Sequence, residues 1–164
     1  MTTKIILLLS VVTSGLTAGL FWAYAYSVMP ALRSVPDGVF VTTMNRVNAV
    51  IPVSGWFWLC FGGGLVLAVA AVIAVAVGDG RESLPWLIAA AAAFVIAVVV
   101  TGAVNIPLNT GLEEVSAASD PAALAAARQR HEMPWIRANV VRAVFHTIAF
   151  VSSAVALLVY RGQR

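Results

Sequence analysis

Four long apolar stretches, separated by shorter polar ones, dominate the pattern of hydrophobic positions along the chain. Each contains about 20 residues or more with few charges, which is the length that a helix needs to cross the hydrocarbon core of a membrane. The pattern therefore predicts an all-α protein, a four-transmembrane-helix bundle in which residues 1–164 form a single integral membrane domain. The expected spans lie at about 5–29, 54–77, 85–104 and 135–160.

Two of the polar connections carry helical patterns of their own. Apolar residues recur at helical spacing from Phe40 to Ile51, which predicts a short amphipathic helix between spans 1 and 2, near the membrane interface. Asp120 followed by Pro121 is typical of a capped helix start and predicts a helical connector between spans 3 and 4. We interpret the charges of this connector as solvated and place the start of the fourth span at Pro134.

The composition agrees with a membrane protein. Hydrophobic residues make up 61% of the 164 residues and charged residues only 10%, whereas soluble globular domains have about 25% charged residues. The length leaves no room for a soluble catalytic domain, so any chemistry lies within or at the edge of the helices. We expect an integral, multi-pass protein of the cell membrane in contact with lipid, and no basic tract indicates binding to nucleic acid.

The orientation in the membrane is less clear from the sequence. The first apolar stretch is longer than the apolar core of a signal peptide, so we expect it to remain as a span. Four spans put both termini on one side, and basic residues flank both sides, so the positive-inside rule does not decide. We expect cytoplasmic termini, because basic residues on the other side lie in segments that we suspect of functional roles.

The fourth span has polar residues where a lipid-facing helix would be apolar. One face, about 60° wide on a helical wheel, holds Trp135, Asn139, Arg142 and His146, and Ser153 follows on the same stripe. An arginine inside a bilayer costs about 2.5–3.5 kcal/mol on insertion scales, so it usually faces a bundle interior and has a partner. We interpret this stripe as the inner wall of a site.

A second polar face follows the first span. It holds Ser10, Thr13, Ser14, Thr17 and Tyr24. Small hydroxyl residues let helices approach closely and bond back to their own helix carbonyls, so we interpret the serines and threonines as packing residues. Tyr24, near the end of this face, is either a packing or interfacial residue or part of a site.

Further polar residues gather at the membrane face where the fourth span begins. The third span ends there, and Pro107 breaks it between two asparagines that either satisfy the loosened backbone or point into a cavity. Bundle interiors commonly hold ligand sites. The candidates for one polar cluster at the mouth of the bundle, with His146 one turn deeper, are Tyr24, Asn45, Asn48, Asn105, Asn109, Asn139 and Arg142.

The sequence gives little support to a metal site. Cys60 is the only cysteine, and no pair of histidine, cysteine or carboxylate residues lies three or four apart within a span. We therefore expect no metal and no cofactor. Ligation of haem by His146 is the alternative that remains open.

Four motifs, spread over nearly the whole chain, carry a family resemblance. The chain has an aromatic-rich helix end before Met29-Pro30, a Met-x-x-x-Asn segment ending at Asn48, an Asn-x-Pro-Leu-Asn motif from Asn105 to Asn109, and a Trp-x-x-x-Asn-x-x-Arg motif from Trp135 to Arg142. In these motifs the chain resembles the anthrone oxygenase family of small four-span membrane proteins, the DUF1772 group. Ala138 stands where many members have a second tryptophan, which bears on the shape of the aromatic pocket and on the substrate.

The resemblance implies a membrane oxidoreductase that converts an anthrone to an anthraquinone with O2 in a polyketide pathway, without an established cofactor. An anthrone is flat and apolar, and its central CH2 is acidic because the resulting anion is an aromatic enolate. As a hypothesis, Arg142 with Asn139 and Asn109 stabilises the oxygen, and His146 is the catalytic base. The other residues expected to bind the substrate are Tyr24, Asn45, Asn48, Asn105 and Trp135.

Two other classes of function remain open. The arginine and the asparagines could form a structural network that joins four helices, without catalysis. Alternatively, the protein could bind or carry a quinone or lipid-like molecule without converting it. Gly62–Gly64 and the nearly featureless third span would allow a homo-oligomer but do not require one.

Overall fold

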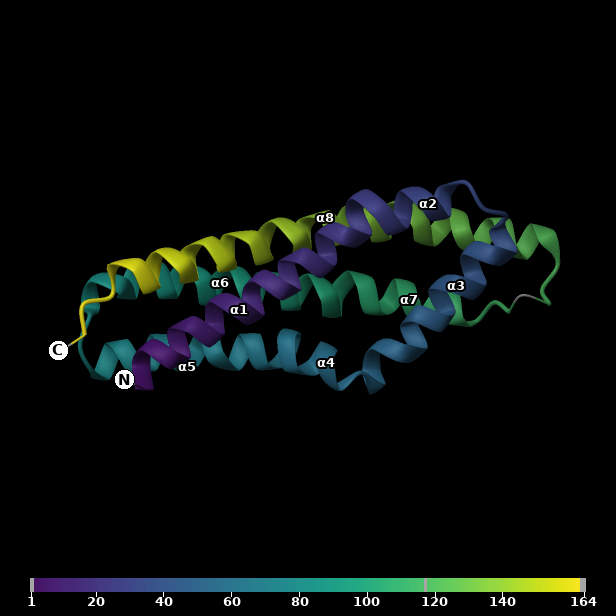
Figure 1. The fold of residues 1–164 in the computed structure, drawn as a ribbon. Helices are drawn as coiled ribbons and strands as arrows, with labels where there is room; N and C mark the ends of the chain where they lie inside the picture. Colours follow the sequence, from purple (N-terminus) through teal and green to yellow (C-terminus); the bar gives the residue numbers. More distant parts are fainter. Residues whose placement is uncertain (1, 117, 163–164) are drawn as a thin grey trace.

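The computed structural model of the protein describes residues 2–116 and 118–162 (Figure 1). Within them all regular structure is helical, and four helical rods are long and apolar enough to cross a membrane. These rods extend over Thr2–Arg33, Gly55–Val77, Arg81–Glu113 and Pro121–Val159. The predicted all-α bundle of four membrane-spanning helices is thus confirmed.

Three of the rods consist of several helical segments. The first contains α1 (Thr2–Ala23), η1 (Tyr24–Val28) and α2 (Met29–Arg33). The second contains α4 (Gly55–Phe57), η3 (Trp58–Gly62) and α5 (Gly63–Val77). The third contains η4 (Arg81–Ser83), α6 (Leu84–Val100), η5 (Thr101–Asn105) and α7 (Ile106–Glu113). The fourth is α8 (Pro121–Val159), while α3 (Asp37–Val50) and η2 (Ile51–Val53) connect the first rod to the second.

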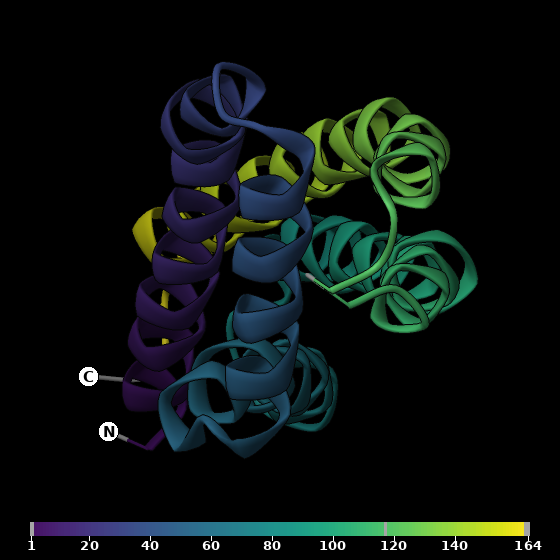
Figure 2. The same cartoon turned by 90° about the vertical axis from the view of Figure 1, so that its right-hand side faces the viewer.

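Both termini lie at one end of the bundle, and α2, α3, α7 and the start of α8 lie at the other end (Figure 1). The long helix α8 packs along α1 and α6, and α5 packs against the same two helices to complete the bundle. The end-on view in Figure 2 shows α3 in front of the bundle, beside α1 and α2. The end of the molecule opposite the termini therefore gathers segments that are far apart in the sequence.

The helix α3 is the amphipathic helix that the sequence predicts between spans 1 and 2. It buries Phe40 and Met44 in one apolar cluster with Met29 and Trp135, while Arg46 lies exposed on its outer side. This apolar face fixes α3 across the end of the bundle, because its burial removes two large side chains from water. The polar residues of its last turns are thereby held close to the bundle axis.

The connector between spans 3 and 4 is not a separate element, because it continues into the fourth span as the single helix α8. Asp120 caps this helix as predicted: its carboxylate accepts hydrogen bonds at 3.0 Å from the backbone N–H groups of Ala122 and Ala123. Pro134 lies inside the helix and removes one helical hydrogen bond. The helix continues through Pro134 because side chains on both sides of it are packed against other elements.

Arg128 corrects our interpretation of the connector charges as solvated. Its guanidinium donates to the carbonyl oxygens of Leu32, Arg33 and Val35 at 2.8–3.1 Å, where α2 ends. The same group forms ion pairs with Asp37 at 2.9 Å and with Glu132 at 2.7 Å. The last carbonyls of a helix have no partner within the helix and favour a nearby cation, so Arg128 ties the end of α2 to α8.

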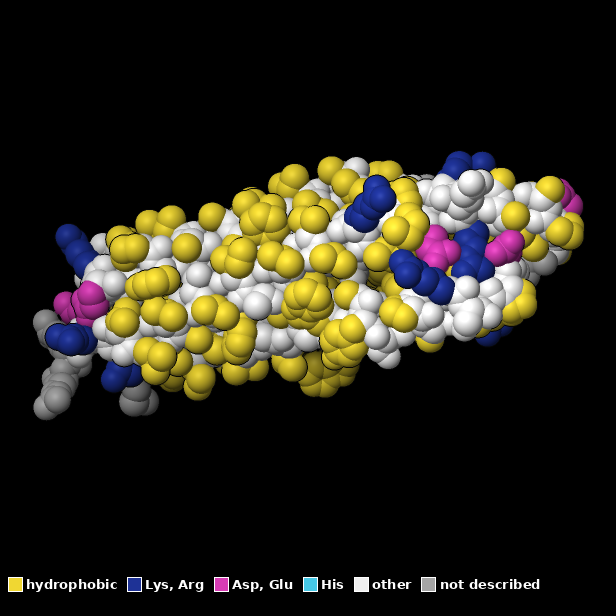
Figure 3. Space-filling view, turned by 90° about the horizontal axis from the view of Figure 1, so that it is seen from above, with side chains coloured by type: hydrophobic (Ala, Val, Ile, Leu, Met, Phe, Trp, Pro, Cys, Tyr) yellow, Lys and Arg dark blue, Asp and Glu magenta, His cyan; other side chains and the backbone are white. Residues whose placement is uncertain are grey.

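The surface agrees with insertion into a membrane. The space-filling view in Figure 3 shows an apolar band over the length of the bundle, with charged side chains gathered toward the two ends. Large apolar residues such as Leu16, Val66 and Val99 are more than half exposed. Lipid is the environment that such a surface requires, so the protein is an integral membrane protein. The side on which the termini lie remains our prediction.

Candidate active site

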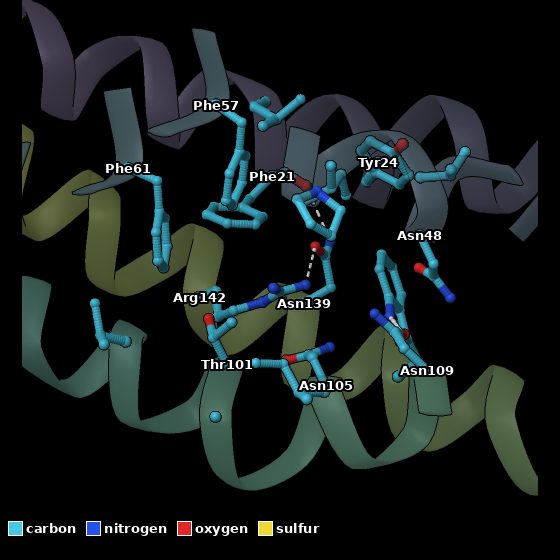
Figure 4. Close-up of a pocket in the computed structure, with 18 of the residues that line it drawn as sticks. Phe21, Tyr24, Asn48, Phe57, Phe61, Thr101, Asn105, Asn109, Asn139 and Arg142 are labelled. Carbon is cyan, nitrogen blue, oxygen red and sulfur yellow. Dashed lines mark hydrogen bonds between the residues drawn. The ribbon is translucent and has the colours of Figure 1, made fainter. Parts of the chain in front are cut away.

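A cavity of about 550 Å³ lies between the rods, and Val47 and Asn48 of α3 are among its lining residues (Figure 4). Its walls are largely apolar and aromatic, with Phe21, Phe57, Phe61 and Val98 among the lining residues. A volume of this size suits a small organic molecule. The polar lining residues are Tyr24, Asn48, Thr101, Asn105, Asn109, Thr110, Glu113, Trp135, Asn139 and Arg142.

Each of the first three rods contains one π-helical turn, and all three turns contribute to the wall of this cavity. The turns η1, η3 and η5 supply Tyr24, Phe61 and Asn105 to the lining. Pro30 and Pro107 follow η1 and η5, and because proline has no N–H, the α-helical bonding pattern cannot continue through these positions. Single π turns are frequent at functional sites.

Arg142 is the centre of the cavity wall. It is only 6% exposed, and its guanidinium lies 4.3 Å from the ring centre of Phe21 and 5.4 Å from that of Trp135. One N–H group donates to Asn139 Oδ1 at 3.1 Å, whereas the Nε group has no partner. Every ion pair within the described residues involves other arginines. Arg142 is thus a buried cation without a counter-ion in the part of the chain that the structure describes.

Asn139 is bonded at both ends of its amide, whereas Asn48 and Asn105 have amide atoms without a partner among the described residues. Asn139 donates to the Phe21 carbonyl at 3.0 Å and accepts from Arg142, so both ends of its amide are fixed. Asn105 is 2% exposed, and neither amide atom has a partner within the described residues. Asn48 likewise has an unpartnered amide nitrogen. Buried polar groups normally have partners, so these amides are suited to bind a ligand.

A hydrogen-bonded chain closes the outer part of the wall. Trp135 Nε1 donates to Asn109 Oδ1 at 2.9 Å, and His131 Nε2 lies 3.4 Å from the same oxygen. The His131 ring stacks on Trp135 with 6.1 Å between ring centres. Tyr24 lies on another side of Trp135, with 5.8 Å between ring centres. This arrangement holds the indole ring in one position beside the cavity.

A sequence profile of the anthrone oxygenase family matches residues 56–152, which is more than half of the chain. The chain belongs to the anthrone oxygenase family. The matched region includes Asn105, Asn109, Trp135, Asn139 and Arg142, all on the cavity wall. No curated protein and no solved structure matches the chain.

Most of the residues expected from the sequence line the cavity of this anthrone oxygenase family member. Asn45 does not: its amide nitrogen donates to the carbonyls of Leu112 and Val115 at 3.2 and 3.1 Å and so ties α3 to the end of α7. The candidates that line the cavity are Tyr24, Asn48, Asn105, Asn109, Trp135, Asn139 and Arg142.

His146 also lies apart from the cavity. It is fully buried, and its ring lies 4.5–5.7 Å, centre to centre, from the rings of Phe21, Phe61 and Phe94. These rings pack around the imidazole, and His146 is not among the residues that line the cavity. Among the described residues, no group of three or more histidine, cysteine or acidic side chains could hold a metal ion.

Sequence reasoning missed three contributors to the site. Phe21 lies under the Arg142 guanidinium, and His131 supports Asn109 from behind. Glu113 lines the cavity and is exposed. A signal for Glu113 was present, because it follows Asn109 by four residues and therefore shares a helical face with it.

Proposed function

We propose that this protein is an oxygenase, embedded in the membrane, that converts a flat aromatic of the anthrone type, a polyketide or a similar phenolic, to a quinone with O2. The observation that carries this proposal is Arg142, a buried cation without a counter-ion among the described residues, on the wall of an apolar cavity. Burial of an unpaired charge is costly, so the ligand that matches this wall is apolar with one oxygen that becomes negative. An anthrone that loses a proton from its central CH2 has this character.

The polar wall would act by stabilising the enolate oxygen. Arg142 would donate to this oxygen, and Asn139 would hold the guanidinium in place through the hydrogen bonds on both ends of its amide. Asn105 would supply a further N–H donor, which has no partner among the described residues. Donors fixed in a site that excludes water stabilise a developing oxyanion strongly, and loss of one typically lowers turnover about 10²- to 10³-fold.

The aromatic walls would hold the rings of the substrate. Phe21, Phe57 and Trp135 offer flat apolar surfaces on different sides of the cavity, and aromatic groups pack favourably in offset or edge-to-face arrangements. Trp58 and Ile106 line the cavity and are also more than half exposed on the outside of the bundle. The substrate would therefore enter from the lipid, where a flat apolar molecule concentrates.

The oxidation needs only the substrate anion and O2. The CH2 carbon loses two hydrogens and gains one oxygen atom from O2, and the second oxygen atom leaves as water. The electrons come from the substrate, so we propose that no resident cofactor takes part.

The test is oxygen uptake by purified protein in lipid nanodiscs with dithranol, a hydroxylated anthrone, corrected for spontaneous oxidation in empty nanodiscs. We expect faster uptake and formation of the corresponding quinone in the absorption spectrum. Anthracene, which has the same three rings but no carbonyl, serves as the control and should not react. No acceleration would contradict the oxygenase proposal, and tight binding of dithranol without turnover would instead support the carrier.

A further inference from the structure

Glu113 lines the cavity described above from the end of α7. It is the last residue of α7 and lines the cavity, yet it is exposed, whereas Asn105 and Arg142 are buried. Among the described lining residues it is the only acidic side chain. Its position therefore combines access to the cavity with access to water.

Glu113 continues a polar row that starts deep in the bundle. Asn105, Asn109 and Glu113 follow each other at intervals of four residues and share one helical face. Figure 4 shows Asn105 and Asn109 directed from this rod toward α8, on which Asn139 and Arg142 lie. Along the helix axis the row extends over about 12 Å, given a rise of 1.5 Å per residue. A buried cation, Arg142, and an exposed carboxylate, Glu113, thus line the same cavity.

We propose that Glu113 is the base that removes the proton from the CH2 group of the substrate, directly or through one water molecule. This inference rests on the oxygenase reaction proposed above. The C–H bond breaks, the proton moves to the carboxylate of Glu113, and the electron pair stays on the ring system as an enolate with its oxygen beside Arg142. Glu113 then releases the proton to water, and the enolate passes its electrons to O2.

The other groups of the cavity are unsuited to this step. A phenol such as Tyr24 and a guanidinium hold their protons at neutral pH, and asparagine amides do not accept one. His146 is packed among phenylalanine rings, and His131 contacts Asn109; neither lines the cavity. A carboxylate is the remaining proton acceptor, and its contact with water lets it return to the charged form after each turnover.

The experiment measures proton removal without oxidation. Wild-type protein in nanodiscs is incubated with dithranol in D2O under argon, and deuterium exchange at the CH2 group is followed by NMR above the protein-free rate. We expect the exchange rate with Glu113→Gln to be at least about 10²-fold lower than with the wild type, because this is the usual contribution of a general base. Glu114→Gln is the matched control, because this neighbouring carboxylate is exposed and lies outside the cavity; it should exchange at the wild-type rate.

Oxygen uptake by the same variants distinguishes a failure of the proposed base from a failure of the proposed oxygenase reaction. Uptake by Glu113→Gln should recover as the pH rises, because hydroxide then forms the enolate without the base. One possible result is that the wild type exchanges deuterium, Glu113→Gln does not, and neither protein consumes O2. This result would support Glu113 as the base and contradict the oxygenase reaction. An unchanged exchange rate with folded Glu113→Gln would overturn the proposal that Glu113 is the base. Loss of exchange in His146→Phe but not in Glu113→Gln would assign the role to His146, and a wild type with no exchange and no uptake would overturn both proposals.

Discussion

Two arginines of the same helix, Arg128 and Arg142, have opposite surroundings. Arg128 lies near the water-exposed end of α8, where two carboxylates and three carbonyls use its N–H groups. Arg142 lies just over half way along α8 (Pro121–Val159), and among the described residues only the Asn139 oxygen accepts from it. A guanidinium whose hydrogen bonds are used by the fold stabilises the fold. One whose N–H groups remain free beside a cavity is available to a ligand.

The largest effect should follow from Arg142→Leu. We expect oxygen uptake with dithranol to fall about 10²- to 10³-fold, because the enolate loses its charged donor. The melting temperature should stay the same or rise, because the substitution removes a buried charge without a counter-ion. Arg137→Leu, an exposed arginine on the same helix, is the control and should keep its activity. A parallel loss of folding and activity in Arg142→Leu would mean that this arginine is structural.

Arg128→Leu should give the reverse result. Its removal leaves the carbonyls at the end of α2 and two carboxylates without their donor, so we expect a loss of stability on the order of 2 kcal/mol. Turnover per folded molecule should change little, since Arg128 lies outside the cavity. Thermal unfolding beside oxygen uptake measures both quantities, with Arg130→Leu, exposed on the same helix, as control. Full stability in Arg128→Leu would contradict the role of this side chain as a tie between α2 and α8.

The same contrast should hold for two asparagines, with smaller effects. Asn45→Ala loses two hydrogen bonds to backbone carbonyls and should lower stability by about 1–2 kcal/mol. Asn105→Ala loses no hydrogen bond to the described residues, so its stability should not fall. We expect instead a drop of about tenfold in turnover, less than for Arg142, because this donor is neutral and Arg142 still holds the oxyanion; tenfold is equivalent to one ligand hydrogen bond of about 1.4 kcal/mol. If Asn105→Ala unfolded more easily than Asn45→Ala, the distinction between bonded and open amides would fail.

The smallest effects belong to the hydroxyl seam of α1, which comprises Ser10, Thr13, Ser14 and Thr17. Thr13 and Thr17 donate to carbonyls of their own helix at 2.9 and 2.7 Å, so these two buried hydroxyls are satisfied, whereas the Ser14 hydroxyl has no partner among the described residues. Thr17→Ser keeps this donor and should leave activity unchanged, with a stability loss below about 1 kcal/mol for the missing methyl group. A large loss of oxygen uptake in folded Thr17→Ser would show that the seam takes part in the site.

The sequence alone predicted the four spans, the amphipathic helix and most of the cavity residues, for physical reasons. The length of an apolar stretch and the spacing of its apolar residues show where a membrane span lies. A polar residue on such a helix must face the interior of the bundle. Asn139 and Arg142 were found in this way. The third span needed the additional signal of Pro107, because its asparagines lie where the helix is interrupted.

The depth of the cavity could not be predicted. Arg142 and His146 share one helical face, and a helical wheel does not distinguish them. The cavity ends between them because Phe21, Phe61 and Phe94, from three other rods, fill the space around the imidazole. These contacts join residues far apart in the chain. The same limit explains Asn45, whose carbonyl partners belong to α7 and to the turn after it.

The exposure of Trp58 and Ile106 on the outer surface of the cavity has a consequence for how affinity is defined. For a molecule that reaches the cavity from lipid, the concentration in the bilayer determines how much of the protein is occupied. O2, which is also apolar, is enriched in the same phase. The membrane then acts as a reservoir whose volume sets the dilution of both reactants. Apparent Michaelis constants would scale with the amount of lipid in the assay, and values expressed per litre of buffer would not be comparable between preparations.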